Sequence, residues 1–396
     1  MSRIARQVFA VAVLAVVLAP GPSAAQDASR AALIAARQAD KARTLHAYVP
    51  NKGERIALRI ESILSAQPRV YTWFGSIYRG GWVAAGPGFR QKFGGTGLFD
   101  AHAGISLRNY KLVDTSVRLP SLAGQRLQVA GQATWLDAPK VAFYGIGNRS
   151  LPHDEDAHEQ FQYQSTTAGG HADLRVAGPL SVGGSVDYLR VESDASNPAA
   201  FGSQAVLFET NPSWVRSSAF GLFDWRPSPL YARRGGFWRA TWSNYAQQAG
   251  TGFAFREFEA EASQLVPILR ENWVIALRAR VTTTYTDAGN DVPFYLLPSL
   301  GGGSSVRGYH SWRFRDRNAL LLNAEYRWTP SHFLDMALFL DAGQVAPRPA
   351  DLHFTELHTG YGIGARFHTP AATVLRIDVA RSEEGFTVHW STVQRF

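Results

Sequence analysis

The sequence VPFYLLPSLGGGSSVRGYHSWRFRDRNALLLNAEYRWTPSHFLDMALFLDAGQV, residues 292–345, decides the fold of this chain. It contains a glycine-rich loop, a single arginine within Val306-Arg307-Gly308-Tyr309, and two runs of alternating residues behind that tetrad. Successive side chains of a β-strand point to opposite faces, so a period of two residues predicts a strand in each run.

The two runs separate apolar from polar side chains. In residues 319–328 one face carries Leu320, Leu322, Ala324, Tyr326 and Trp328, and the other carries Leu321, Asn323, Glu325 and Arg327. In residues 334–343 one face carries Leu334, Met336, Leu338, Leu340 and Ala342, and the other carries Asp335, Ala337, Phe339, Asp341 and Gly343. A strand with one apolar and one charged face suits a soluble sheet as well as a membrane barrel, so the runs alone leave both open.

The order of the motifs resembles the BamA/TamA superfamily, the outer-membrane assembly and secretion barrels that include the two-partner-secretion transporters. The resemblance lies in the tetrad, in the acid of Ala324-Glu325-Tyr326-Arg327, and in Phe339-Leu340-Asp341-Ala342-Gly343. It implies that the tetrad tips a long extracellular loop folded into the barrel lumen, where Arg307 pairs with Glu325 and Asp341. A guanidinium makes directional, charge-assisted bonds to carboxylates, so it can hold a loop on a wall. The implied site residues are Val306, Arg307, Gly308, Tyr309, Glu325, Phe339, Asp341 and Gly343.

Composition favours the same class of protein. The 396 residues include no cysteine, 36 glycines and 11 tryptophans, with 12% aromatic residues and a mean hydropathy of −0.15. Strands of a transmembrane β-barrel alternate, so such a chain does not look hydrophobic in bulk. The net charge of +8 comes from scattered arginines and lysines, which predicts a polar lumen and basic rims near anionic lipid headgroups rather than a nucleic-acid surface. No cofactor is expected.

The amino-terminal region divides at two predicted boundaries. Residues 1–25 combine Arg3 and Arg6 with an apolar run and Ser23-Ala24-Ala25, the pattern of a cleaved secretory signal. Residues 26–68 are expected to be a helical or linker segment without POTRA domains, the periplasmic modules of BamA-type proteins. Apolar residues at helical spacing in 53–66 predict an amphipathic helix, either at the membrane face or as a plug inside the lumen.

Residues 69–396 are expected to form one antiparallel barrel of about sixteen strands, an even number as in bacterial outer-membrane barrels. Long connections at 137–159, 193–213 and 287–318 alternate with short turns. The predicted strands are 69–79, 82–92, 98–108, 110–119, 126–136, 160–176, 180–192, 214–225, 237–247, 253–265, 272–286, 319–329, 333–345, 360–369, 373–381 and 386–396.

The resemblance extends to other parts of the barrel. Residues 143–148 (FYGIGN) resemble a recurrent loop of short BamA-like proteins, and 361–366 and 375–380 resemble the penultimate strands. It also implies a weak lateral seam between the first and last strands. Gly75 marks the first, since glycine weakens a strand. The terminal aromatic Phe396 marks the last.

The sequence does not favour a metal site, a phosphate loop or a hydrolase. His153, Asp154, Glu155, Asp156, His158 and Glu159 cluster in one predicted loop, but their spacing matches no metal motif, and a solvated loop is the preferred interpretation. Residues 301–308 lack the lysine of a phosphate loop, and no Gly-x-Ser-x-Gly elbow is present. His389 and Ser391 could form a base–hydroxyl pair as in some outer-membrane lipid deacylases, but no acid partner is placed by the sequence.

The resemblance implies a protein of the bacterial outer membrane that aids insertion or translocation of proteins, and not an enzyme. Its expected partners are outer-membrane lipids, unfolded outer-membrane or secreted clients, and a separate periplasmic partner. A passive pore or structural barrel remains an alternative, as does a less favoured lipid hydrolase using His389 and Ser391.

The alternation of long and short connections predicts the topology. Loops 137–159, 193–213 and 287–318 should emerge at the cell surface, with both chain ends on the periplasmic side. Single cysteines introduced at Asp156 and Ser196 of this cysteine-free chain should therefore react with an impermeant maleimide on intact cells. Reaction that requires an opened outer membrane would contradict this topology.

Overall fold

The computed structural model describes a barrel and a few residues of the amino-terminal region. The chain divides into two units, residues 1–59 and 60–396, described here separately. The predicted signal segment 1–25, and residues 26–68 except those given next, lie outside the described residues. Within the described residues no helix has the length and apolar composition needed to cross a membrane. The described residues are 32, 33, 35–38, 40, 55, 68–149, 158–268, 271–331, 333–368 and 373–391; those at 32–40 and Arg55 are helical.

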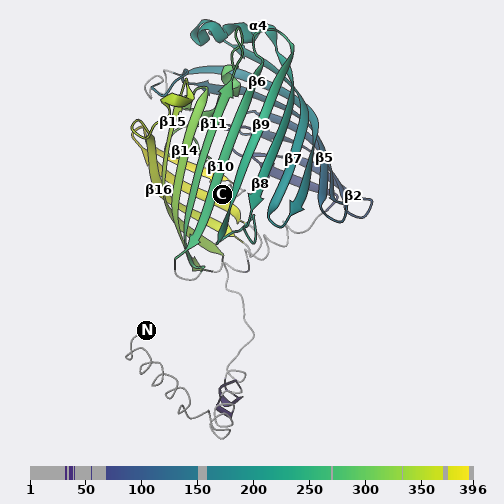
Figure 1. Ribbon diagram of the computed structural model, residues 1–396, viewed down its shortest axis with the longest axis vertical. Coiled ribbons are helices and arrows are strands. Elements are labelled where there is room, and N and C mark those ends of the chain that lie inside the picture. Colours follow the sequence, from purple (N-terminus) through teal and green to yellow (C-terminus); the bar gives the residue numbers. More distant parts are fainter. Residues whose placement is uncertain are drawn as a thin grey trace, which may run out of the picture. The chain divides into compact units, whose positions relative to one another are not determined.

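Residues 70–391 contain sixteen strands in one antiparallel sheet that curves into a nearly closed barrel (Figure 1). This confirms the predicted fold class. Each strand pairs with its neighbours in the chain, except that β11 pairs with β14 across the inserted hairpin β12–β13. The strands are β1 (Val70–Gly75), β2 (Ala84–Phe93), β3 (Gly97–Ser106), β4 (Lys111–Leu122), β5 (Leu127–Phe143), β6 (Glu159–Ala177), β7 (Leu180–Ala195), β8 (Ser213–Asp224), β9 (Gly235–Ala249), β10 (Phe255–Pro267), β11 (Trp273–Tyr285), β14 (Asn318–Ser331), β15 (Leu334–Ala346), β16 (His358–His368), β17 (Thr373–Ser382) and β18 (Gly385–Ser391).

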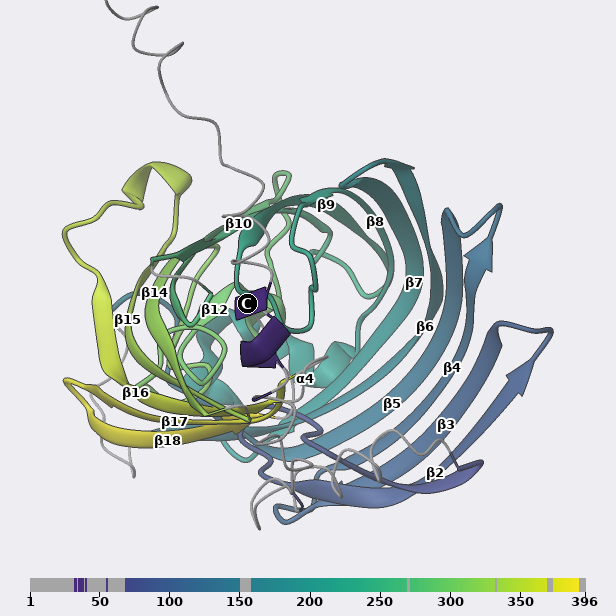
Figure 2. The ribbon, with the colours of Figure 1, turned by 90° about the horizontal axis from the view of Figure 1, so that it is seen from below.

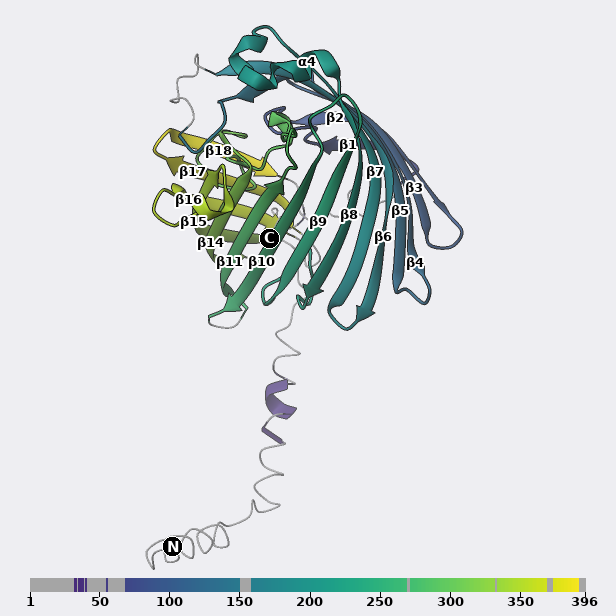
Figure 3. The ribbon, with the colours of Figure 1, turned by 45° about the horizontal axis from the view of Figure 1, so that its top comes forward.

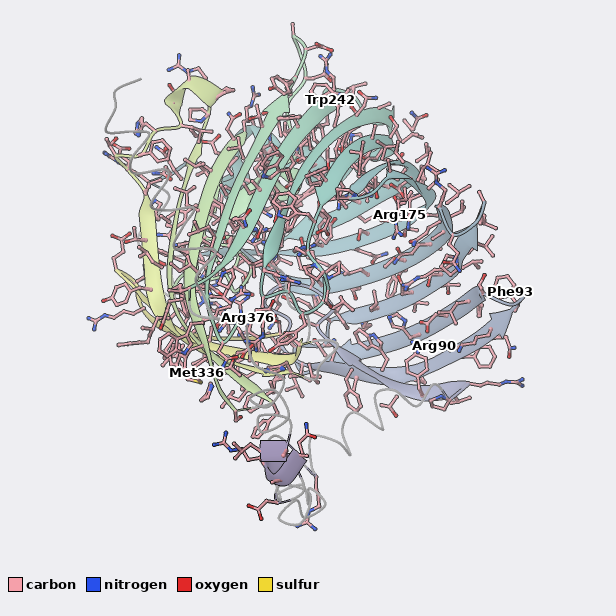
Figure 4. The ribbon with its side chains drawn as sticks, turned by 60° about the horizontal axis from the view of Figure 1, so that its bottom comes forward. Arg90, Phe93, Arg175, Trp242, Met336 and Arg376 are labelled. Atoms are coloured by element: carbon pink, nitrogen blue, oxygen red, sulfur yellow. The ribbon has the colours of Figure 1, made fainter. Side chains whose placement is uncertain are left out.

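Period two sorts the side chains between the lumen and the outer surface. On β15, Leu338 and Leu340 are about half exposed on the outer face, whereas Phe339 and Asp341 are buried on the inner face. Figure 4 shows Met336 and Trp242 outside the curved sheet and Arg376 inside it. Lipid can cover an apolar exterior, and the polar residues then line the interior, as expected for a barrel that crosses a membrane.

The strands are longest at β5 and β6 and shortest at the two edges of the sheet. The edge strands β1 and β18 have 6 and 7 residues, whereas β5 and β6 have 17 and 19. A tilted strand needs about 9–11 residues to span a bilayer. The central strands therefore extend beyond the bilayer, and the edge strands are shorter than its thickness over their described residues.

Two predicted strand ends, at residues 79 and 136, differ from the observed ones by four and seven residues. The first strand ends at Gly75 and not at residue 79, and the chain beyond turns so that Tyr78 stacks on Tyr163 and Trp312. Residues 137–143, predicted as a loop, continue β5. A bulge at Ala138–Val141 keeps Val141 and Phe143 buried while the ladder with β6 continues.

The longer connections gather at one end of the barrel, called here the long-loop end. They include the helices η1 (Pro198–Val206) and α4 (Leu207–Thr210), which were not predicted, and η3 (Pro349–Asp351) (Figure 1). Beneath them lies a hydrophobic core with stacked and edge-on aromatic contacts among Phe143, Phe161, Phe201 and Phe294. The loops thus pack on one another and on the upper wall of the barrel.

Candidate functional site

The segment between β11 and β14 folds into the barrel. It contains η2 (Phe294–Leu296) and a two-stranded hairpin, β12 (Ser299–Leu300) paired with β13 (Phe314–Arg315). Figure 2 shows β12 inside the ring of strands. Arg307 lies between the two hairpin strands and is only 1% exposed.

Arg307 is bonded to both carboxylates that the sequence singled out. Its Nε and Nη2 donate to the two oxygens of Asp341, each at 2.6 Å, and its backbone N–H donates to Asp341 Oδ2 at 3.0 Å. Its Nη1 donates to Glu325 Oε1 at 2.6 Å. Burial alone would lower the pKa of Arg307, but the charges of Glu325 and Asp341 outweigh it and raise that pKa above its usual value.

Both contacts exist because of the register of the β14–β15 hairpin. A hairpin turn centred near Phe333 would place Glu325 opposite Asp341, and a tighter turn at Pro330-Ser331 would separate the two acids by about four residues, so that Arg307 could reach only one. The structure has neither. Glu325 pairs with Phe339, and Asp341 pairs with Asn323, so the acids are offset by two residues. That offset is about 7 Å along the strand. One guanidinium spans it, because Nε and Nη2 face Asp341 while Nη1 faces Glu325.

Sequence reasoning missed part of the charge cluster. Glu325 also accepts bonds from Arg327 at 2.8 Å, Arg366 at 2.8 Å and Arg376 at 3.1 Å. Asp378 accepts from Arg376 at 2.6 Å and lies 3.4 Å from Arg307 Nη1. The period of two residues in β16 and β17 places Arg366, Arg376 and Asp378 on the lumen face. It does not place them beside Glu325, because that contact joins strands distant in sequence.

The ring of Phe339 packs against the guanidinium of Arg307. The guanidinium carbon of Arg307 lies 3.5 Å from the centroid of the Phe339 ring, a cation–π contact. The ring in turn lies against Gly362 on β16, where a Cβ would come within 2.7 Å of it. A side chain at Gly362 would therefore displace the surface on which Arg307 rests.

Glycines also let the loop backbone approach the wall. A Cβ at Gly360 on β16 would overlap the carbonyl oxygen of Arg307, and one at Gly343 on β15 would press on Leu300 and Val306. Gly308 has a φ of +100°, which favours glycine, and its carbonyl accepts a 2.7 Å bond from Ser382. The loop is thus seated on positions that lack side chains.

The remaining tetrad residues connect the loop to the core and to the last hairpin. Val306 is fully buried in a cluster with Leu300, Phe314 and Leu321, and the buried ring of Tyr309 belongs to the same cluster. The Tyr309 hydroxyl donates to Glu383, at 3.2 Å, in the turn between β17 and β18. Every predicted loop residue lies in or beside this one assembly.

The two predicted seam residues lie apart from that assembly. Gly75 ends β1 and pairs with Ala84 on β2. Phe396 lies outside the described residues. Among the described residues no ladder pairs β1 with β18, so the sheet has two edges (Figure 3).

Two other candidate groups have ordinary surroundings where they are described. His389 Nε2 lies 3.0 Å from Thr387 Oγ1, and its cross-strand neighbour Asp378 is bonded to Arg376 and Arg307. In the loop cluster, Glu159 accepts a bond from Asn197 at 2.9 Å. Residues 153–156 of the loop cluster lie outside the described part, and the described residues contain no metal-binding group of three or more acids and histidines.

Comparison with known proteins decides the family. The Omp85 superfamily domain matches residues 92–396. The chain belongs to the Omp85 superfamily. The BamA/TamA resemblance is therefore confirmed at the level of the superfamily, whose barrels are outer-membrane proteins.

Solved structures share the Omp85 fold at low sequence identity. BamA from Haemophilus ducreyi lacking POTRA domains 1–3 is 14% identical with a TM-score of 0.63, over 82% of this chain and 70% of that one. CdiB from Escherichia coli is 13% identical with a TM-score of 0.56, over 82% and 62%. CdiB from Acinetobacter baumannii is 11% identical with a TM-score of 0.52, over 83% and 60%. No curated protein sequence matches the chain.

Replacing Arg307 should release the loop. Arg307→Ala leaves the buried Asp341 with the amide of Asn323 as its only side-chain partner, while Glu325 keeps three arginines, and this should destabilise the docked loop by about 3 kcal/mol. Limited proteolysis should then cleave within residues 300–310, and ion conductance through the barrel should rise. Arg307→Lys should restore little, because an ammonium lacks the planar fork that bridges two acids.

A matched control is the exposed pair Arg190–Glu192 on β7, where Arg190→Ala should cost less than about 1 kcal/mol. Wild-type protease resistance in Arg307→Ala would show that the loop is held by its apolar contacts alone.

A glycine substitution should loosen the loop with every charge in place. Gly360→Ala puts a methyl group where the Arg307 carbonyl oxygen lies, so the loop must move off β16. Gly221→Ala is the control, because nothing lies within 4 Å of a Cβ there. We expect greater protease access in Gly360→Ala than in Gly221→Ala; equal access would mean that β16 shifts to accept the methyl group.

Proposed function

We propose that this barrel aids the insertion or translocation of proteins at the bacterial outer membrane, with its last and first strands as the working edge. The observation that carries the proposal is the open edge of the sheet: over the described residues no ladder pairs β1 with β18, in a chain that belongs to the Omp85 superfamily. An edge strand presents unpaired N–H and C=O groups that can pair with another strand.

The membrane makes such an edge unstable and therefore reactive. Unpaired backbone groups in the hydrocarbon region cost several kcal/mol each, because no water is present to satisfy them. A client strand that adds to β1 or β18 would satisfy them and would be guided into the membrane. The proposed clients are unfolded outer-membrane or secreted proteins.

The seated loop supports a role for the edge rather than for an open pore. Arg307, Tyr309 and Arg313 tie the loop to β15, to the β17–β18 turn and, through Asp378, to β17. These contacts brace β17 and the β17–β18 turn from inside and fill that part of the lumen. Among the described contacts, none of these three residues reaches β1, and the loop reaches only the chain just beyond it, where Trp312 stacks on Tyr78. We therefore propose that the β1 side moves when the seam opens.

We propose no catalytic role. The interpretation as a lipid hydrolase would need Ser391 activated by His389 with an acid behind it, and Asp378, the acid across the strand from His389, is bonded through Oδ2 to Arg376. A separate periplasmic partner is proposed to supply client capture. The second candidate function, a passive pore, is the alternative outcome of the seam experiment.

Cross-linking the two edges should separate these functions. Thr72 on β1 and Val388 on β18 both face outward, so we choose these positions for a pair of cysteines, and the yield of disulfide on oxidation reports whether the two edges meet. In proteoliposomes the oxidised double variant should lose most insertion of an unfolded barrel client, and a reductant should restore it. Ion conductance is measured on the same samples.

The control joins two strands that never need to part. Val379 and Val388 are direct partners across β17 and β18, so their double cysteine variant should stay active when oxidised. Full insertion activity in the Thr72–Val388 cross-linked protein would reject the working edge, and conductance without any insertion would favour the passive pore.

A further inference from the structure

The outer face of β17 carries one arginine on an otherwise apolar wall. Arg381 is exposed and lies one residue before β17 ends at Ser382, at the long-loop end. Ile377 and Val379 precede it on the same face and are also partly exposed. Arg381 therefore faces the surroundings of the barrel and not its lumen.

Aromatic residues flank Arg381 on both neighbouring strands. Its direct partners are Tyr361 on β16 and Phe386 on β18, which are 53% and 71% exposed. The guanidinium carbon lies 5.0 Å from the centroid of the Phe386 ring. A cation between two rings is suited to the boundary between headgroups and acyl chains, where amphipathic side chains gather.

Two apolar rows continue this surface away from the long-loop end. Each row crosses β16, β17 and β18 through direct cross-strand partners. The rows are Ile363–Val379–Val388 and Ala365–Ile377–Trp390. The surface thus has a positive charge at one end and hydrocarbon over the next rows, which is the polarity of an anionic lipid.

Arg381 has no carboxylate partner among the described residues, unlike two outward arginines near this end. Arg190 pairs with Glu192 at 3.0 Å, and Arg256 pairs with Asp287. The acids nearest in sequence to Arg381 are occupied by the inward loop: Glu383 by Tyr309, and Glu384 by Arg313 at 2.5 Å. A cation on a lipid-facing wall is destabilising unless an anion meets it.

We propose that Arg381, with Tyr361 and Phe386, binds the phosphate group of an anionic lipid whose acyl chains lie along the two apolar rows. The site lies on the last three strands, beside the sheet edge. The opposite face of the same segment touches the inward loop, since the Arg381 carbonyl lies against Gly308 and Ser382 donates to the Gly308 carbonyl. The lipid and the loop therefore contact β17 from its two sides.

Native mass spectrometry of the full chain in detergent tests the site, with phosphatidylglycerol as the probe. Arg381→Gln should weaken the tightest phosphatidylglycerol binding about fivefold, the effect of one interfacial cation. Arg381→Lys keeps the charge and should bind within about twofold of wild type. Arg190→Gln is the matched control, because Arg190 faces outward but already has an acid partner, and it should bind as wild type.

Two further probes separate the lipid from free phosphate. Glycerol 3-phosphate carries the phosphate without acyl chains and should not displace the lipid, and diacylglycerol carries the chains without phosphate and should bind weakly to wild type. Unchanged binding in a folded Arg381→Gln, or equal loss in Arg190→Gln, would overturn the proposal. Displacement by glycerol 3-phosphate would show a site for a free anion instead. If Arg381→Gln does not fold, the wild-type protein decides the question. Equal affinity of the wild type for diacylglycerol and phosphatidylglycerol would then overturn the proposal.

Discussion

The bond between Arg307 and the two carboxylates of Asp341 and Glu325 is the interaction on which the interior of this barrel depends. All three side chains are buried, with exposures of 2% or less. A buried charge is tolerable only when its partners satisfy it, because desolvation is otherwise larger than the gain from pairing. Each member of the cluster thus requires the others, and the inward loop cannot leave without exposing charges to a lumen arranged around them.

Glycine positions make that bond possible as much as the charges do. The loop backbone reaches the wall where β16 lacks side chains, at Gly360, and the Phe339 ring reaches Gly362 for the same reason. Protein interiors are packed to high density, so a single methyl group at such a contact is felt. The opposite charges make Asp341 and Glu325 the partners of Arg307. The glycines let the loop backbone come close enough for these bonds to form.

The edges of the sheet differ from the charge cluster in the lumen, because in the described part of the chain their backbone groups lack a partner strand. Over the residues that the structure describes, β1 and β18 are the shortest strands of the barrel and no ladder joins them. Within a bilayer this arrangement leaves backbone groups that need partners. The braced β17–β18 hairpin and the less braced β1 make the two edges unequal, and the outward Arg381 lies on the braced side.

The sequence by itself determined the class of fold, the inward and outward faces of residues 319–328 and 334–343, and the identity of the central arginine with two of its acids. It could do so because period two is a local property and because the motifs stand in a definite order along the chain. Only the tertiary structure decided the two-residue offset of Glu325 and Asp341, the arrival of Arg366, Arg376 and Asp378 from β16 and β17, and the glycine seats beneath the loop. Those features depend on hairpin register and on contacts between strands far apart in sequence, and a shift of register changes them without changing the pattern of any single strand.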